Sequence, residues 1–195
     1  MEEQNNAGIK SALYRICLIT ASALLALGVC LGITSAEKFH QKTVTNGIHY
    51  FAPEKGFHIN FPDSPNKESS ELNFSQLKQP LHYNEYKSCP GSKLCFAVGF
   101  VDFPSKWKFA GARKLLQGAL TVLTQKEPDT QLVSQEMTSH NDYPAINFHL
   151  KKGEKDVEGR IVLIGSTFYN LSVTYALADA SPVESQQFLD SFYTS

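Results

Sequence analysis

The stretch CFAVGFVDFPSKWKFAGARKLLQGALTVLTQK, from Cys95 to Lys126, decides the fold class, because the spacing of its apolar residues changes partway along. Cys95 to Phe103 is almost continuously apolar, which is typical of a strand in the middle of a sheet. From Ser105 to Lys126 the apolar residues are three or four positions apart, which predicts one long amphipathic helix. A helix that packs on a sheet is therefore expected.

Segments on both sides of this stretch alternate between apolar and polar residues, as half-buried strands do. Phe57 to Phe61 reads FHINF and is followed by a proline. Ala145 to Leu150 places three apolar side chains on one face and Asn147 and His149 on the other. A capping box, Ser181 to Glu184, predicts a closing helix that turns its apolar residues inward. Further strands are expected at 72–76, 81–87, 131–137, 157–165 and 168–175, with a charged turn at 151–156. These elements predict an α+β domain, mainly antiparallel sheet with helices packed on it.

An uncharged segment precedes this domain. Residues 16–36 contain no charged side chain, and Ile16 to Ile33 reads ICLITASALLALGVCLGI. As a helix, the segment is about 31 Å long, which matches the hydrocarbon core of a bilayer. It is predicted to be an uncleaved transmembrane anchor, or else a secretory signal that is removed at Thr34-Ser35-Ala36. A buried core helix is the weakest alternative, because a helix that is apolar on every face needs a larger protein around it.

The chain is therefore divided into a cytoplasmic N-terminal tail (1–15), a transmembrane anchor or signal segment (16–36), a linker (37–47) and one folded domain (48–195). We expect a single-pass membrane protein whose domain lies outside the cytoplasm, in the periplasm or the extracellular space, or a secreted protein if the leader is cleaved. A net charge of -1 argues against binding nucleic acid through the overall field of the protein. A hydrophobic content of 42% argues against disorder.

Two cysteines of the domain are close in sequence, in the segment Cys89-Pro-Gly-Ser-Lys-Leu-Cys95. The Pro-Gly turn between two strand-like runs would bring them to the separation of a disulfide. We expect a Cys89–Cys95 disulfide, which an exported domain favours, and the alternative is a pair of free thiols in a reducing compartment.

Basic and aromatic residues alternate at the start of the expected long helix, from Lys106 to Phe109. Such a pattern can face an anionic membrane surface or RNA. We expect instead that Trp107 packs on the sheet while the charged side chains stay in solvent.

Motifs at the joints of these elements carry a resemblance to a known family. They are Tyr50-Phe51, Glu54 to Pro62 with Pro65, Asp102-Phe103-Pro104, Asp142-Tyr143-Pro144, Arg160 to Leu163, Thr167 to Leu171, and Phe188 to Phe192. They resemble the PsbP-like and DcrB-like domain family, over about Tyr50 to Phe192. The resemblance implies an α-β-α sandwich around an antiparallel sheet. It implies little about activity, because this fold occurs in proteins that bind quite different partners.

Candidate catalytic and metal-binding residues are few. His140, Asp142 and His149 are the strongest metal candidates, because a hairpin would bring His140 near His149. Their spacing is not that of a tight site, and we expect them to be exposed polar residues beside a turn. No Gly-x-Ser-x-Gly motif and no glycine-rich phosphate loop is present.

The sequence thus predicts a non-enzymatic, envelope-exposed binding or assembly module, with no cofactor, no metal and no catalytic residue. We expect it to be held at the membrane by its N-terminal helix, or secreted, and to bind a protein partner of unknown identity and no nucleic acid. The alternative is an envelope enzyme that binds a small ligand or a metal through His140, Asp142 and His149. A purely structural role in the envelope is a third possibility.

Overall fold

The computed structural model of the chain describes residues 47–74, 77–91, 94–125, 129–176 and 182–195. The predicted anchor or signal segment and the helix-capping Ser181 lie outside these residues. Within the described ranges, no helix has both the length and the apolar character needed to cross a bilayer.

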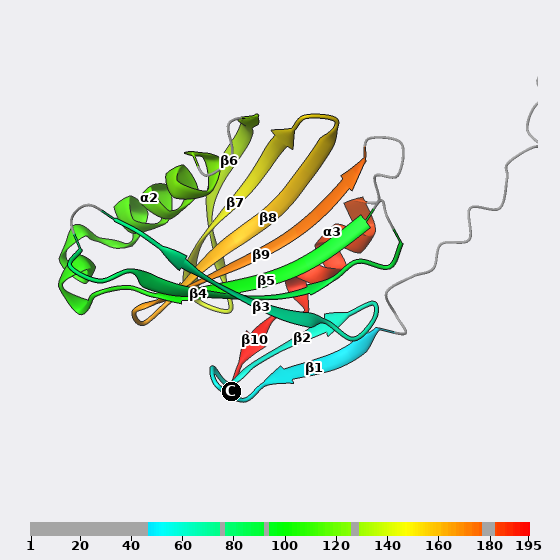
Figure 1. Cartoon of the computed structure of the whole chain (residues 1–195), viewed down its shortest axis with the longest axis horizontal. Coiled ribbons are helices and arrows are strands. Elements are labelled where there is room, and N and C mark those ends of the chain that lie inside the picture. Colours follow the sequence, from blue (N-terminus) through cyan, green and yellow to red (C-terminus); the bar gives the residue numbers. More distant parts are fainter. Residues whose placement is uncertain (1–46, 75–76, 92–93, 126–128, 177–181) are drawn as a thin grey trace, which may run out of the picture. The chain divides into compact units, whose positions relative to one another are not determined.

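The described strands form two antiparallel sheets (Figure 1). The larger sheet has the order β3-β4-β5-β9-β8-β7-β6, and the smaller sheet has the order β1-β2-β10. Their bounds are β1 Ile48–Ala52, β2 Phe57–Phe61, β3 Asn66–Leu72, β4 Leu81–Ser88, β5 Leu94–Asp102, β6 Thr130–His140, β7 Tyr143–Lys152, β8 Lys155–Ile164, β9 Thr167–Ala176 and β10 Tyr193–Thr194. The predicted α+β class, mainly antiparallel sheet, is confirmed.

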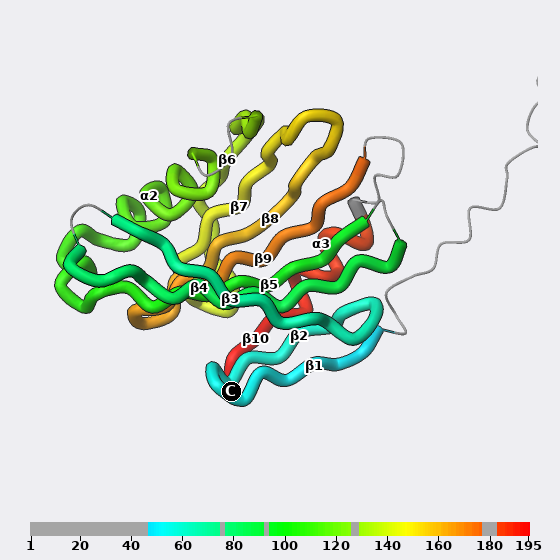
Figure 2. The backbone as a smooth tube through the Cα atoms, viewed as in Figure 1, coloured from blue at the N-terminus to red at the C-terminus, as the bar shows by residue number. Residues whose placement is uncertain are grey.

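Each face of the large sheet carries its own apolar core. On one face, helix α2 (Ala112–Gln125) packs on β6, β7 and β8 and buries Leu116 and Leu120. On the other face lie helix α3 (Pro182–Asp190) and the small sheet, and Figure 2 shows the chain returning from α3 to β2 through β10. The sheet is therefore an inner layer between two different covers.

Alternation along the strands explains this burial. Phe57, Ile59 and Phe61 of β2 are completely buried, as the FHINF pattern predicts. On β7, Ile146, Phe148 and Leu150 belong to the core under α2. Near the end of the chain, three predicted inward residues are also buried, namely Phe188, Leu189 and Phe192.

The prediction of one long helix from Ser105 to Lys126 is wrong. The segment forms a 3₁₀ helix, η2 (Ser105–Ala110), and then the α-helix α2. Between them, Gly111 has a φ of 82°, which a right-handed helix does not accept, and its N–H donates to the carbonyl of Lys108. The glycine therefore ends the first helix, and α2 begins at the next residue.

One predicted strand, 72–76, and one predicted turn, 151–156, also differ from the structure. β3 ends at Leu72, so Phe74 follows the strand instead of belonging to it. Lys155 and Asp156 are paired residues of β8, which leaves only Gly153 and Glu154 in the turn that was expected at 151–156. The charged residues next to this turn are thus paired residues of β7 and β8 and not part of the loop.

The hairpin of β4 and β5 brings the two cysteines together. The sulfur atoms of Cys89 and Cys95 are 2.11 Å apart, the distance of a disulfide bond. The predicted pairing is confirmed.

Candidate functional site

An apolar cavity of about 250 Å³ lies beside α2, over the part of the sheet that the helix does not cover. The cavity exists because α2 packs on β6 to β8 and leaves the neighbouring strands without a helix above them. Its lining consists of Leu72, Phe74, Leu81, Tyr83, Val101, Phe103, Trp107, Lys114, Leu115, Gly118, Ala119, Val122, Leu123, Ile161, Phe168 and Asn170.

The helical wall of the cavity follows from the spacing of residues on α2. Leu116 and Leu120, four residues apart, point to the fully buried core. Leu115, Ala119 and Val122 form a neighbouring stripe that is half-buried and lines the cavity. The helix thus has a wide apolar face, and only part of it is covered by the sheet.

Three aromatic residues that line the cavity pack against one another. The ring of Trp107 lies 6.2 Å from that of Phe103 and 6.0 Å from that of Phe74, measured between centroids. Trp107 is therefore packed on the domain, as predicted. Phe109, two residues later, is 95% exposed, which the sequence pattern did not indicate.

Two polar side chains interrupt the apolar lining at the sheet. The hydroxyl of Tyr83 donates to Oε1 of Glu85 at 3.0 Å, and the tyrosine lies across Gly99, where a Cβ would collide with its ring. Burial first, and then the nearby carboxylate of Glu85, raise the pKa of Tyr83 well above its ordinary value. Tyr83 therefore stays protonated at neutral pH and is a hydrogen-bonding group.

Asn170 lies beside Tyr83 and forms a hydrogen bond with it. Its Oδ1 atom is buried and has no hydrogen-bond partner among the described residues. A buried acceptor of this kind is costly unless something binds it. Asn170 lines the cavity and can therefore accept a hydrogen bond from a bound molecule or a water.

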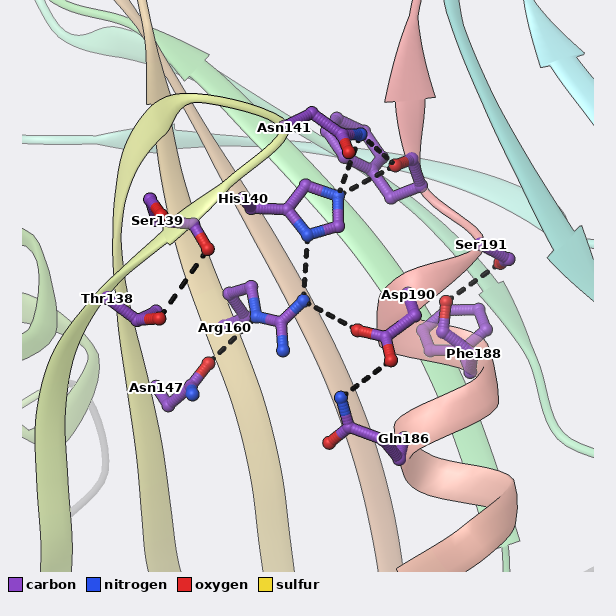
Figure 3. A network of polar contacts seen from close by, with 11 residues as sticks. Thr138, Ser139, His140, Asn141, Asn147, Arg160, Gln186, Phe188, Asp190 and Ser191 are labelled. Atoms are coloured by element: carbon purple, nitrogen blue, oxygen red, sulfur yellow. Dashed lines mark hydrogen bonds and ion pairs between the residues drawn. The ribbon is translucent and has the colours of Figure 1, made fainter.

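A separate polar network lies on the other side of the sheet, between β6, β8 and α3 (Figure 3). Arg160, which is only 7% exposed, contacts Asn147, His140 and Asp190 at 2.7 to 2.9 Å. Although partial burial opposes it, the hydrogen bonds from Gln186 and Arg160 lower the pKa of Asp190. Each of these polar groups already has a protein partner, so we interpret the network as structural. It connects α3, through Asp190, to Arg160 of the sheet.

The structure does not bring His140, Asp142 and His149 together. His140 pairs with Tyr143 and belongs to the Arg160 network, whereas His149 pairs with Ser134 and contacts Asp156 at 2.6 Å. The two histidines are six β7 positions apart in this register, about 20 Å along the hairpin. Asp142 lies in the turn, with a φ of 66°. In the described part of the chain, no group of three or more metal-ligating side chains is found.

No protein-family model matches the chain, and no curated protein matches its sequence. Solved structures do resemble it. The solution structure of cyanobacterial PsbP from Synechocystis sp. PCC 6803 is 10% identical, with a TM-score of 0.47, and the match covers 76% of this chain and 92% of that protein. This protein has the fold of the PsbP-like family that the sequence motifs resemble.

Two other solved structures are similar to the chain. A protein of unknown function from Pseudomonas aeruginosa is 12% identical (TM-score 0.39, covering 68% of this chain and 85% of that one). A protein from Bacteroides thetaiotaomicron is 13% identical (TM-score 0.38, covering 76% of this chain and 48% of that one). At these identities the likeness concerns the fold alone.

One histidine pair was missed by sequence reasoning. Nε2 of His49 and Nδ1 of His58 are 3.1 Å apart on the small sheet, and His58 stacks on Tyr193. The pairing of β1 with β2 places the two histidines diagonally across the strands. The alternation of both segments, joined by a short turn, was the signal that could have found this pair.

Proposed function

We propose that the chain is a non-enzymatic binding module that holds the apolar part of a small ligand in the cavity beside α2. The observation that carries this proposal is the lining of the cavity: twelve of its sixteen residues have no polar side-chain atom. A concave, mostly apolar surface with a few polar groups is the usual form of a small-molecule site.

The same lining supports binding over catalysis. Tyr83, Asn170, Lys114 and the indole N–H of Trp107 are its polar groups, and the tyrosine is already hydrogen-bonded to Glu85. General acid–base chemistry needs a titratable group near the reacting atoms with a pKa close to the working pH. Burial moves the pKa of Tyr83 away from that range, and an amide does not titrate.

We further propose that the N-terminal apolar segment delivers this domain to the outer side of a membrane, either as an anchor or as a removed signal. The Cys89–Cys95 pair supports an oxidising compartment. The intact mass of the protein from its own host distinguishes anchor from cleaved signal. Thiol labelling with and without reductant tests the location, and free thiols at both positions would contradict it.

The cavity has a built-in reporter, because Trp107 is the one tryptophan of the sequence. Decanol is a suitable neutral probe. We expect decanol to change the fluorescence of Trp107 in a saturable way, since a bound chain displaces water from the indole.

Gly118 allows this experiment to be controlled. It lies at the helical wall, and a Cβ added there would have no neighbour within 4 Å. Gly118→Phe is expected to fill the opening and abolish the decanol response. Gln117→Phe, on the exposed side of the same helix, should leave the response intact. If decanol binds both variants equally, or does not bind the unmodified protein, the proposal fails.

A further inference from the structure

The two ends of the cavity carry opposite charge. Lys114 is the one charged residue of its lining and lies near the N-terminus of α2. The 23 residues from Phe103 to Gln125 contain four basic side chains, Lys106, Lys108, Arg113 and Lys114, and no carboxylate. The positive end of the helix dipole points the same way. This end of the cavity therefore attracts an anion.

The opposite end leads to carboxylates. Val122 and Leu123 line both the cavity and an adjoining hollow, and that hollow is also lined by Glu68 and Glu85. Lys114 and Val122 are eight residues apart on α2, which corresponds to about 12 Å along the helix axis. An anionic group would be repelled at the Glu68 and Glu85 end and attracted at the Lys114 end.

Apolar residues occupy the distance between the charged ends. Leu115 and Ala119 line this part of the wall, and Gly118 leaves open space above it. Glycine in the interior of a helix lowers its stability relative to alanine. Gly118 lowers the stability of α2, and a ligand that occupies the space beside it would explain why a glycine is present at this position.

We propose that the ligand is a single-chain amphiphile with an anionic head, of the fatty-acid class. Its head lies beside Lys114, and its chain runs under Gly118 towards Val122. This inference rests on the proposed function, since it concerns the same cavity. A cationic amphiphile is the competing ligand, but Lys114 lines the cavity itself, whereas Glu68 and Glu85 line the adjoining hollow and not the cavity.

Three probes with the same chain test the head group: decanoate, decanol and decyltrimethylammonium. Each is titrated against the full chain in mild detergent at physiological ionic strength, with Trp107 fluorescence and calorimetry as readouts. Charges that do not adjoin the site are largely screened under these conditions. We expect decanoate to bind about two- to fivefold more tightly than decanol, as for an exposed ion pair, and the cation to bind most weakly.

Charge reversal at the helix start provides the matched variants. Lys114→Glu should remove the preference for decanoate over decanol and improve binding of the cation. Arg113→Glu makes the same change of charge at the preceding residue, which is exposed and does not line the cavity. The order of the three binding affinities should therefore stay the same in this variant. Circular dichroism checks that both variants are folded.

The outcomes separate this inference from the proposed function. If decanoate and decanol bind equally and Lys114→Glu changes nothing, the anionic head is wrong while the binding module stands. If decyltrimethylammonium binds most tightly, the cavity prefers a cationic head group, and the proposed anionic head beside Lys114 is wrong. If none of the three probes binds, both proposals fail.

Discussion

Nη1 of Arg160 lies 2.7 Å from Nδ1 of His140, and this contact fixes the tautomer of the imidazole. A guanidinium group donates hydrogen bonds and accepts none, so Nδ1 must be the acceptor. The proton is then on Nε2, which donates to the carbonyl of Phe192 at 2.7 Å. His140 thus links Arg160 of β8 to the residues that follow α3.

This arrangement predicts a specific nuclear magnetic resonance spectrum. Long-range ¹⁵N–¹H correlations near neutral pH should show His140 with a proton on Nε2 and a bare Nδ1. His140→Ala should lower the free energy of unfolding by about 1–3 kcal/mol, because a buried arginine loses a partner. His82, whose side chain is 78% exposed, provides a control in which the alanine variant should change stability by less than about 0.5 kcal/mol. A proton found on Nδ1 would contradict the network.

Two glycines near the cavity should respond in opposite directions to alanine. Gly118→Ala is expected to raise the free energy of unfolding by up to about 1 kcal/mol, because the helix gains propensity and no neighbour is within 4 Å of the new methyl. Gly111→Ala should lower it by about 1–2 kcal/mol, because its φ is 82°. Urea unfolding of both variants measures the difference. Stabilisation by Gly111→Ala would refute the described break between η2 and α2.

The disulfide should contribute to the stability of the β4–β5 hairpin. The double variant Cys89→Ser/Cys95→Ser is expected to unfold at a lower urea concentration, with a loss of about 2 kcal/mol for a loop of this size. Reductant should lower the stability of the unmodified protein by a similar amount and leave the variant unchanged. Equal sensitivity of the two proteins to reductant would show that the bond contributes nothing.

Asp102 should make stability depend on pH in the acidic range. Lys55 Nζ lies 2.6 Å from its Oδ2, and the hydroxyl of Thr167 lies 2.6 Å from its Oδ1. Partial burial opposes ionisation, but Lys55 and Thr167 outweigh it and lower the pKa of Asp102. The stabilisation is therefore complete above the ordinary carboxyl pKa near 4 and is lost as the pH falls through the lower, folded value.

Asp102→Asn tests this dependence. Because the carboxylate is largely exposed, the variant should lose about 0.5–1 kcal/mol at neutral pH, and the difference should shrink as the pH falls below about 4. Lys55→Met removes the same ion pair from the other side and should behave alike. A stability difference that is constant from pH 7 to pH 2 would exclude the ion pair as its cause.

Local patterns were enough to predict much of the fold. In Phe57–Phe61 and Ala145–Leu150, apolar and polar residues alternate because one face of each strand is buried and the other is not. This pattern can be recognised in the sequence alone. The break at Gly111 was missed, because a glycine within a helical pattern is compatible with both a continuous and an interrupted helix. The spacing of apolar residues does not indicate that the φ of Gly111 is positive.

The candidate site could not be predicted in the same way. Leu72, Leu115 and Phe168 line one cavity but come from β3, α2 and β9, and their apolar character alone assigns them to the core. Which of them stay half-open depends on how far α2 extends over the sheet, which is a tertiary property. His140 illustrates the same point, since its partner Arg160 is twenty residues away in the sequence.

The most direct test of the central claim is quenching of Trp107 by decanoate that carries bromine on a carbon near its carboxylate, the end that is proposed to lie beside Lys114 at the start of α2. If the cavity is the binding site, the probe should quench the fluorescence of the unmodified protein saturably, decanol should reverse the quenching by competition, and Gly118→Phe should prevent it. Quenching that rises linearly without saturation, or that is unchanged in Gly118→Phe, would contradict a ligand site beside α2.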